Sequence, residues 1–197
     1  MVHTSPRLVD DAMATRIRSQ VARLVEAGQW TTRGAGLPTR DVYVRSLSSD
    51  VRLFVARVLD ARCGFVTNAT GDVLQYSSQQ PFIVTFDFAQ QRGLAKHEDG
   101  SESYTVLLAF DQPGLGFDGG GTRFHPLNRP AFTVTPPFGV ALIFPQHIEH
   151  EGVPVARGKR RLLVGFLNST RDMTNEARAA LRVRQAAAFR ELTAAAP

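Results

Sequence analysis

The chain has 197 residues, 43% of them hydrophobic, which is enough to bury the core of one domain. Its net charge of +5 comes mainly from arginines spread along the chain. We expect a solvated basic surface and no nucleic-acid partner, because no clustered patch or recognition motif is present. The single cysteine, Cys63, excludes an internal disulfide and a disulfide-built secreted domain. No apolar run approaches the ~20 residues that span a bilayer, and the first residues lack a signal-peptide core. We therefore expect a cytoplasmic protein without a membrane partner.

Residues 1–72 are predicted to form a helical N-terminal support region. Apolar residues recur there at helical spacing in two segments, and we expect His3, ahead of both, to be disordered. Gly28 ends the first segment, and Ser49 or Asp50 can cap the second. The apolar faces are Ile17, Val21, Leu24 and Val25 in the first segment, and Val51, Phe54, Val55, Val58 and Leu59 in the second.

Residues 73–170 change character, because short apolar runs alternate there with Gly, Pro, Asp and Asn. Many short strands predict a sandwich or barrel. Residues 171–197, rich in Ala and Arg, predict a terminal helix and a frayed tail, and we expect all three regions to form one domain. The expected strands are Pro81–Phe88, Tyr104–Phe110, Ala131–Val134, Val140–Phe144 and Leu162–Leu167.

The residues with the clearest chemical meaning are His97, Asp99, His150 and Arg160. On a strand His97 and Asp99 project to one face, while Glu98 points away. Two histidines and one carboxylate are the ligands of non-haem Fe(II) sites that leave positions open for co-substrate and oxygen. His150 follows an apolar strand, at a natural place for a ligand. A guanidinium such as that of Arg160 can hold a carboxylate in a two-pronged geometry.

Other interpretations of these residues remain open. His147 and His150 can be read as a zinc pair, and a lone His-x-Asp is more often a pair of solvated surface side chains than a metal site. His125 precedes a proline in an expected loop, where we predict a solvated histidine. Arg161 should face away from Arg160, and both can also be read as part of a basic turn at a strand start.

The triplet Gly119-Gly120-Gly121 allows backbone geometries that other residues avoid. No helix start or Lys-Ser/Thr follows it, so a phosphate-binding loop is disfavoured. We predict a tight hairpin or a close backbone approach, with Phe117 and Phe124 on the flanking strands.

Taken in order, these residues and motifs resemble the Fe(II)- and 2-oxoglutarate-dependent dioxygenases of the prolyl 4-hydroxylase-like superfamily, and most of all the catalytic domain of procollagen lysyl hydroxylases. The segments that carry the resemblance are Phe82-Ile83-Val84, Gln91, Leu94, His97 to Ser101, Phe117 to Phe124, and His150 through Arg160 to Phe166. The resemblance implies a mainly β double-stranded β-helix, or jelly roll, with flanking helices. It implies His97, Asp99 and His150 as iron ligands and Arg160 as the partner of the 2-oxoglutarate distal carboxylate, with ascorbate as a reductant.

The chain departs from the family pattern at Phe86, at Arg161, where relatives often have a tyrosine, and by one extra residue near Glu102-Ser103. The departure at Phe86 concerns the co-substrate. Relatives usually carry a tyrosine that binds the co-substrate where this chain has Phe86, so one hydroxyl donor is lost in the cofactor pocket.

The implied reaction is hydroxylation of an unactivated C–H bond with molecular oxygen and release of succinate and CO2. A Lys or Pro side chain in a protein or peptide is the expected substrate, with a free amino acid or small metabolite as the alternative. The rival from another class is a non-catalytic metal-binding jelly-roll module. The sequence does not give the oligomeric state.

Overall fold

The computed structural model describes residues 2–32, 39–70, 74–76, 80–100 and 103–169, with a few positions between 174 and 183. Within these residues the chain forms twelve strands, two α-helices and one short 3-10 helix. In chain order they are β1 (His3–Arg7), α1 (Asp11–Glu26), β2 (Asp41–Tyr43), the 3-10 helix (Val44–Ser46), α2 (Ser49–Thr70), β3 (Leu74–Tyr76), β4 (Phe82–Asp87), β5 (Leu94–His97), β6 (Ser103–Ala109), β7 (Phe117–Gly119), β8 (Thr122–Phe124), β9 (Phe132–Val134), β10 (Val140–Pro145), β11 (His150–Gly152) and β12 (Val155–Ser169).

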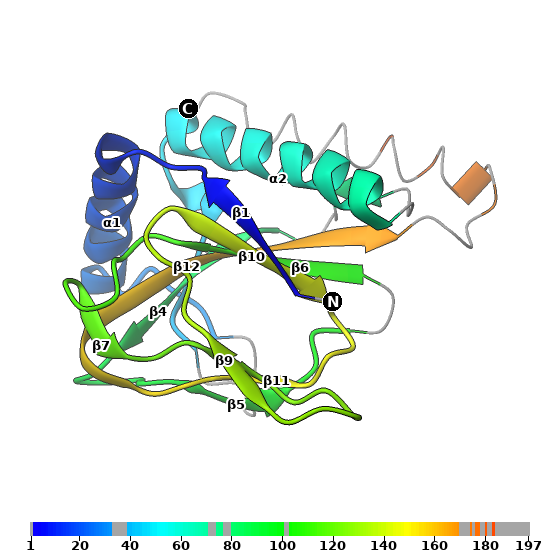
Figure 1. The fold of residues 1–197 in the computed structure, drawn as a ribbon. Helices are drawn as coiled ribbons and strands as arrows, with labels where there is room; N and C mark the ends of the chain where they lie inside the picture. Colours follow the sequence, from blue (N-terminus) through cyan, green and yellow to red (C-terminus); the bar gives the residue numbers. More distant parts are fainter. Residues whose placement is uncertain are drawn as a thin grey trace.

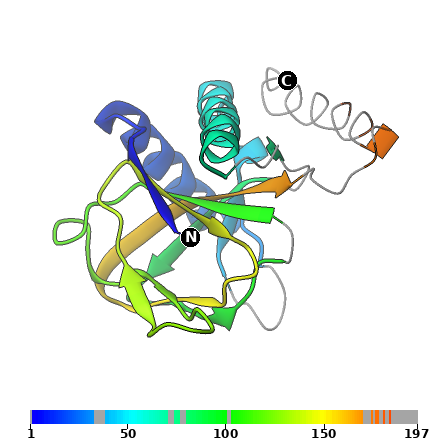
Figure 2. The same ribbon diagram turned by 45° about the vertical axis from the view of Figure 1, so that its right-hand side comes forward.

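The elements lie in three layers. The larger sheet has the order β1-β10-β6-β12-β4-β2, with β3 and β7 also pairing with β12, and the smaller sheet has the order β5-β11-β8-β9. Both helices cover one face of the larger sheet, and the smaller sheet lies below its other face (Figures 1 and 2). All named strand pairs are antiparallel. The predicted mainly β jelly-roll architecture with flanking helices is confirmed.

The two predicted N-terminal helices form as expected. Asp10 caps α1 by accepting the Met13 N–H at 2.7 Å, and Gly28 follows its end at a φ of 70°. The predicted apolar faces of both helices pack on the larger sheet. Their fully buried members are Ile17, Val21, Val51, Val55, Val58 and Leu59.

The long strand β12 supplies both cores of the protein because its side chains alternate between the two faces of the sheet. Leu163 and Leu167 pack in the core beneath the helices. Leu162, Val164 and Phe166 pack in the core between the two sheets. By the same alternation Arg160 faces the inter-sheet core and Arg161 faces the helix side.

The structure corrects three expectations. His3 is not disordered, because it lies in β1 and pairs with Ile143. The N-terminal region contributes β1 and β2 to the larger sheet as well as helices, and Ser5 accepts a hydrogen bond from the Ala141 N–H at 2.9 Å. The strand expected over Leu162–Leu167 is longer at its start, since β12 begins at Val155 and so includes Arg160.

Two further observations concern the expected C-terminal helix and the expected absence of a membrane-spanning segment. The helix expected over 171–197 lies largely outside the described residues. No helix in the described part of the chain is long and apolar enough to cross a membrane.

Candidate metal centre and co-substrate pocket

The smaller sheet brings His97 and His150 together. His97 ends β5, His150 begins β11, and the two are cross-strand partners with ring centroids 4.5 Å apart. Asp99 follows two residues after His97, where its N–H donates to the Gln146 carbonyl at 3.1 Å. Among the described residues these three side chains form a potential metal-binding group, with one ligand atom from each within 4.8 Å of the others.

Backbone carbonyls fix the orientation of both imidazole rings. His97 Nδ1 lies 2.8 Å from the Ala95 carbonyl, and His150 Nδ1 lies 2.9 Å from the Ile148 carbonyl. A carbonyl only accepts hydrogen bonds, so each Nδ1 carries the hydrogen. In the neutral ring, Nε2 then has the lone pair that can bind a metal.

Both Nε2 atoms face Asp99, His97 at 3.6 Å from Oδ1 and His150 at 3.5 Å from Oδ2. Two nitrogen lone pairs aimed at one carboxylate repel it unless a cation lies between them. Imidazole and carboxylate are the donors that suit non-haem Fe(II), so the three residues fit an iron ion.

Burial keeps the group in the form that binds metal. Burial lowers the pKa of His150, which is 5% exposed, and so favours its neutral, ligating form. Burial raises the pKa of Asp99, but the His97 and His150 imidazoles, where protonated, and the hydrogen bond from Thr105 together hold it below its ordinary value. Thr105 Oγ1 donates to Asp99 Oδ2 at 2.6 Å and fixes the carboxylate.

A cavity of about 60 Å³ between the two sheets contains this group at its wall. One water-sized molecule needs roughly 10–15 Å³, so the space suits a small molecule. Most of the wall is apolar, and polar side chains form the rest of it. The lining includes Phe82, Val84, Phe86, Leu94, Leu107, Leu162 and Val164 on the apolar side, and Thr39, His97, Asp99, Thr122, His150 and Arg160 on the polar side.

Arg160 lines the same cavity and is only 2% exposed. Its guanidinium donates to the Gly121 carbonyl at 2.9 Å and to Thr122 Oγ1 at 3.1 Å. Burial lowers its pKa to about 10, so it remains charged at neutral pH. Within the described part of the chain no carboxylate pairs with it. A buried charge is costly without an opposite charge, so the site is suited to an anionic ligand.

The glycine triplet makes a close backbone approach to this arginine. Gly119, Gly120 and Gly121 all have positive φ, and a Cβ at Gly120 would lie 3.3 Å from Arg160 Cδ. The triplet does not form a hairpin, since β7 pairs with β12 and β8 pairs with β11 and β9. Instead the chain crosses here between the two sheets, and the Gly121 carbonyl accepts from Arg160.

Phe86 lies beneath the guanidinium. Its ring centroid is 5.7 Å from Arg160 Cζ, and its side chain is 3% exposed. The ring lines the cavity. It offers the guanidinium an aromatic face but no hydroxyl.

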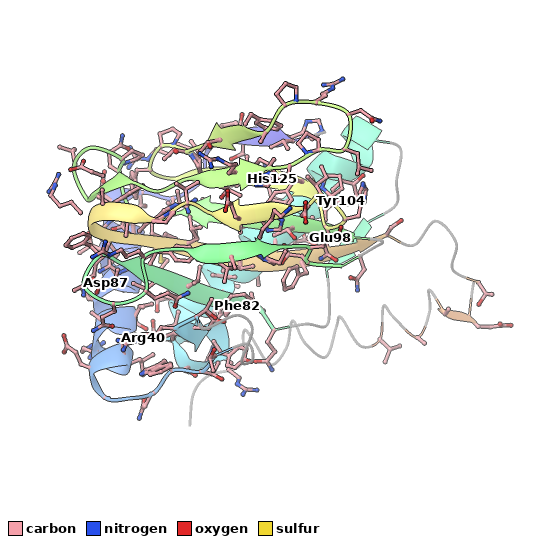
Figure 3. All side chains as sticks on the ribbon, turned by 90° about the horizontal axis from the view of Figure 1, so that it is seen from below. Arg40, Phe82, Asp87, Glu98, Tyr104 and His125 are labelled. Atoms are coloured by element: carbon pink, nitrogen blue, oxygen red, sulfur yellow. The ribbon has the colours of Figure 1, made fainter. Side chains whose placement is uncertain are left out.

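The remaining candidates lie apart from the group. His147 is exposed in the turn between β10 and β11. His125 is half-buried after β8, 3.3 Å from the Glu151 carboxylate, rather than fully solvated. Glu98 and His125 are labelled in Figure 3, and Glu98 is exposed at the end of β5, as predicted. Arg161 pairs with Asp111 at 2.9 Å on the helix side.

Sequence reasoning missed three threonines of the site. Thr105 holds Asp99, Thr122 holds Arg160, and Thr39 lines the cavity from the segment that leads into β2. Threonine is common in strands, so only the three-dimensional placement distinguishes these three.

No protein-family model matches the chain. Among curated proteins, the human multifunctional procollagen lysine hydroxylase and glycosyltransferase LH3 is 28% identical over 167 residues, which cover 75% of this chain and 21% of the relative. The chain therefore spans about a fifth of that relative's length.

Solved structures share the fold. A prolyl-4-hydroxylase of Pseudomonas putida superposes with a TM-score of 0.66 at 12% identity, covering 85% of this chain and 91% of that one. A prolyl hydroxylase of Trichoplax adhaerens, in complex with a hypoxia inducible factor oxygen degradation domain peptide fragment, gives a TM-score of 0.66 at 13% identity, covering 91% and 86%.

The fold is that of the 2-oxoglutarate–Fe(II) oxygenases and prolyl hydroxylases. The curated relative is a lysine hydroxylase, so the resemblance drawn from the sequence motifs to the Fe(II)- and 2-oxoglutarate-dependent dioxygenases is confirmed.

Proposed function

We propose that this chain is an Fe(II)- and 2-oxoglutarate-dependent dioxygenase that hydroxylates an unactivated C–H bond. One observation carries the proposal. Two histidines and a carboxylate arranged for a metal share one small cavity with a buried arginine that has no carboxylate partner among the described residues. A dicarboxylate that binds the metal at one end and the guanidinium at the other satisfies both.

Each residue has a role in this proposal. His97, Asp99 and His150 hold the iron, and Thr105 keeps the carboxylate of Asp99 in place. Arg160, oriented by Gly121 and Thr122, binds the distal carboxylate of 2-oxoglutarate, and Phe86 forms the floor beneath it. The apolar side chains of the inter-sheet core keep bulk water away from the co-substrate.

The bound iron and 2-oxoglutarate supply the oxidative chemistry, in which the co-substrate is converted to succinate and CO2 while oxygen is transferred to the substrate. Ascorbate as the reductant that maintains Fe(II) belongs to the same proposal.

For the substrate we propose a Lys or Pro side chain within a protein or peptide. Two comparisons support it: the curated relative is a procollagen lysine hydroxylase, and one structural neighbour was solved with a peptide fragment. Fold similarity alone does not carry a substrate, so this part needs its own test.

The reaction is tested by incubating the purified protein with Fe(II), 2-oxoglutarate, ascorbate and a library of Lys- and Pro-containing peptides. We expect succinate that depends on Fe(II), and peptides that gain one oxygen atom by mass spectrometry. A matched library of free amino acids identifies a small-molecule substrate instead.

Two results would contradict the proposal. A protein that binds metal but neither binds 2-oxoglutarate nor forms succinate is a non-catalytic binding module. A protein that holds zinc through His147 and His150, with no oxygen consumption, is a zinc protein.

A further inference from the structure

Three side chains, those of Thr39, Phe86 and Arg160, form a row across the larger sheet above the cavity. Arg160 on β12 is the register partner of Phe86 on β4. On the other side of β4, Asp41 pairs with Val84, and the Thr85 N–H donates to the Arg40 carbonyl at 3.3 Å.

Continuing this antiparallel register two residues past Asp41 places Thr39 opposite Phe86. In Figure 3, Phe82 and Asp87 mark the ends of β4, with Arg40 beside it. Thr39, Phe86 and Arg160 all line the cavity.

Thr39 has an unusual environment for a hydroxyl group. It is 3% exposed, and its Oγ1 has no hydrogen-bond partner among the residues that the structure describes. A buried hydroxyl without a partner is unfavourable, and in native proteins it usually has a function or a ligand. The hydroxyl borders the same space as the Arg160 guanidinium, which donates hydrogen bonds to Gly121 and Thr122.

We propose that Thr39 is a co-substrate-binding residue whose hydroxyl donates a hydrogen bond to the carboxylate held by Arg160. It thereby replaces the donor that is lost where this chain has Phe86, from the neighbouring strand and on the same sheet face. The carboxylate then has a charged donor on one side of the Phe86 ring and a neutral donor on the other. This inference rests on the proposed 2-oxoglutarate site.

The test is calorimetric titration of 2-oxoglutarate into the Mn(II)-loaded protein, which measures affinity without turnover. Thr39→Val keeps the shape of the side chain and removes the hydroxyl. We expect it to weaken 2-oxoglutarate binding by roughly tenfold or more, because the lost bond is to a charged group. Thr39→Ser restores the hydroxyl and should recover most of the affinity.

Thr85→Val is the matched control. Thr85 Oγ1 is likewise buried without a partner among the described residues, but it lies on the opposite face of β4, in a groove beside α1. Its removal should leave 2-oxoglutarate affinity unchanged. The melting temperature of metal-free Thr39→Val should not fall, since the variant loses an unsatisfied buried hydroxyl and no bond.

Equal 2-oxoglutarate affinity of wild type and Thr39→Val would overturn the role of Thr39 and leave the proposed function intact. Equal losses in Thr39→Val and Thr39→Ser would also overturn it, since a variant that keeps the hydroxyl would then bind no better than one that lacks it. Absence of 2-oxoglutarate binding in the wild type would instead overturn the proposed function itself.

Discussion

Single hydrogen bonds prepare the metal site before any metal arrives. The carbonyls of Ala95 and Ile148 hold the two imidazole rings, and Thr105 holds the carboxylate between them. Because these partners are backbone groups or a buried side chain, the ligands lose little freedom when an ion binds. The geometry of the site is therefore a property of individual contacts that single substitutions can remove.

Removal of a ligand separates the proposed centre from the competing histidine. Asp99→Ala should weaken Mn(II) or Fe(II) binding by at least about 100-fold. Even substitution of a residue that only hydrogen-bonds a metal ligand lowers metal affinity by roughly 10- to 100-fold. His147→Ala should bind metal as the wild type does, because His147 is exposed and lies apart from the group. Calorimetry with Mn(II) measures both, and the reverse ranking would show that the ligands are assigned wrongly.

Thr105→Val tests the residue that sits behind Asp99. The substitution preserves volume at a fully buried position and removes the 2.6 Å bond to the carboxylate. We expect metal affinity to fall roughly 10- to 100-fold while the variant remains folded. Metal affinity equal to that of the wild type would mean that Asp99 keeps its ligating position without this hydroxyl.

At this scale the sequence predicted which residues would meet, and it missed what holds them. His97, Asp99, His150 and Arg160 carry rare chemistry at recognisable positions, so a motif reveals them. Thr39, Thr105 and Thr122 are ordinary strand residues, and their partners lie in other strands. Only the register between strands brings these hydroxyls to the site.

The strand β12 assigns neighbouring arginines to opposite faces with opposite roles. Arg160 enters the cavity, and Arg161 binds Asp111 both through its guanidinium at 2.9 Å and through its N–H at 2.7 Å. Burial raises the pKa of Asp111 in spite of the Arg161 charge. The ionised form of this carboxylate therefore depends on its ion pair with Arg161.

Substitution of Arg160 should therefore change co-substrate affinity, whereas substitution of Arg161 should change stability. Arg160→Met should weaken 2-oxoglutarate binding by about 10- to 100-fold and leave the metal-free protein at least as stable, because it removes a buried charge. Arg161→Ala should keep the affinity but lower stability by roughly 1.5–3 kcal/mol. Titration calorimetry and urea unfolding measure the two effects, and equal losses of affinity would refute the assignment of faces.

The glycine crossing between β7 and β8 offers a test at the level of one turn. Gly120→Ala should cost about 1–3 kcal/mol for its φ of 69° and should also displace Arg160, weakening 2-oxoglutarate binding. Gly114→Ala is the control, since φ there is 80° but a Cβ meets nothing within 4 Å. It should lose stability alone. Unchanged affinity in Gly120→Ala would show that the close approach does not position the guanidinium.

The elements divide into those that the pattern predicts and those that it does not. The strands β4 and β10 and the Leu162–Leu167 part of β12 are nearly continuous apolar runs because they are buried on both faces. The edge strands β1 and β2 were missed, since the residues of β1 are mostly polar and those of β2 number only three. Their stability comes from pairing with β10 and β4.

At the scale of the whole molecule, the site lies between two sheets whose packing defines the cavity. Ligands that bind only there should stabilise the entire fold. Relative to the Mn(II)-loaded protein, 2-oxoglutarate at about 100 times its dissociation constant should add roughly 2.7 kcal/mol, or a rise in melting temperature of about 5–11 °C. Succinate, Mn(II) alone and the Arg160→Met variant serve as controls. An unchanged melting temperature would mean that the folded protein does not bind 2-oxoglutarate.

The position of β12 also governs how the protein is made. This strand lies between β6 and β4 in space but follows both in the chain. While the ribosome is still synthesising the segment up to Ser169, both neighbours expose unpaired edges, which invite association with other chains. The larger sheet therefore closes only after β12 has been synthesised, and a nascent chain stalled before Val155 has neither of its two cores complete.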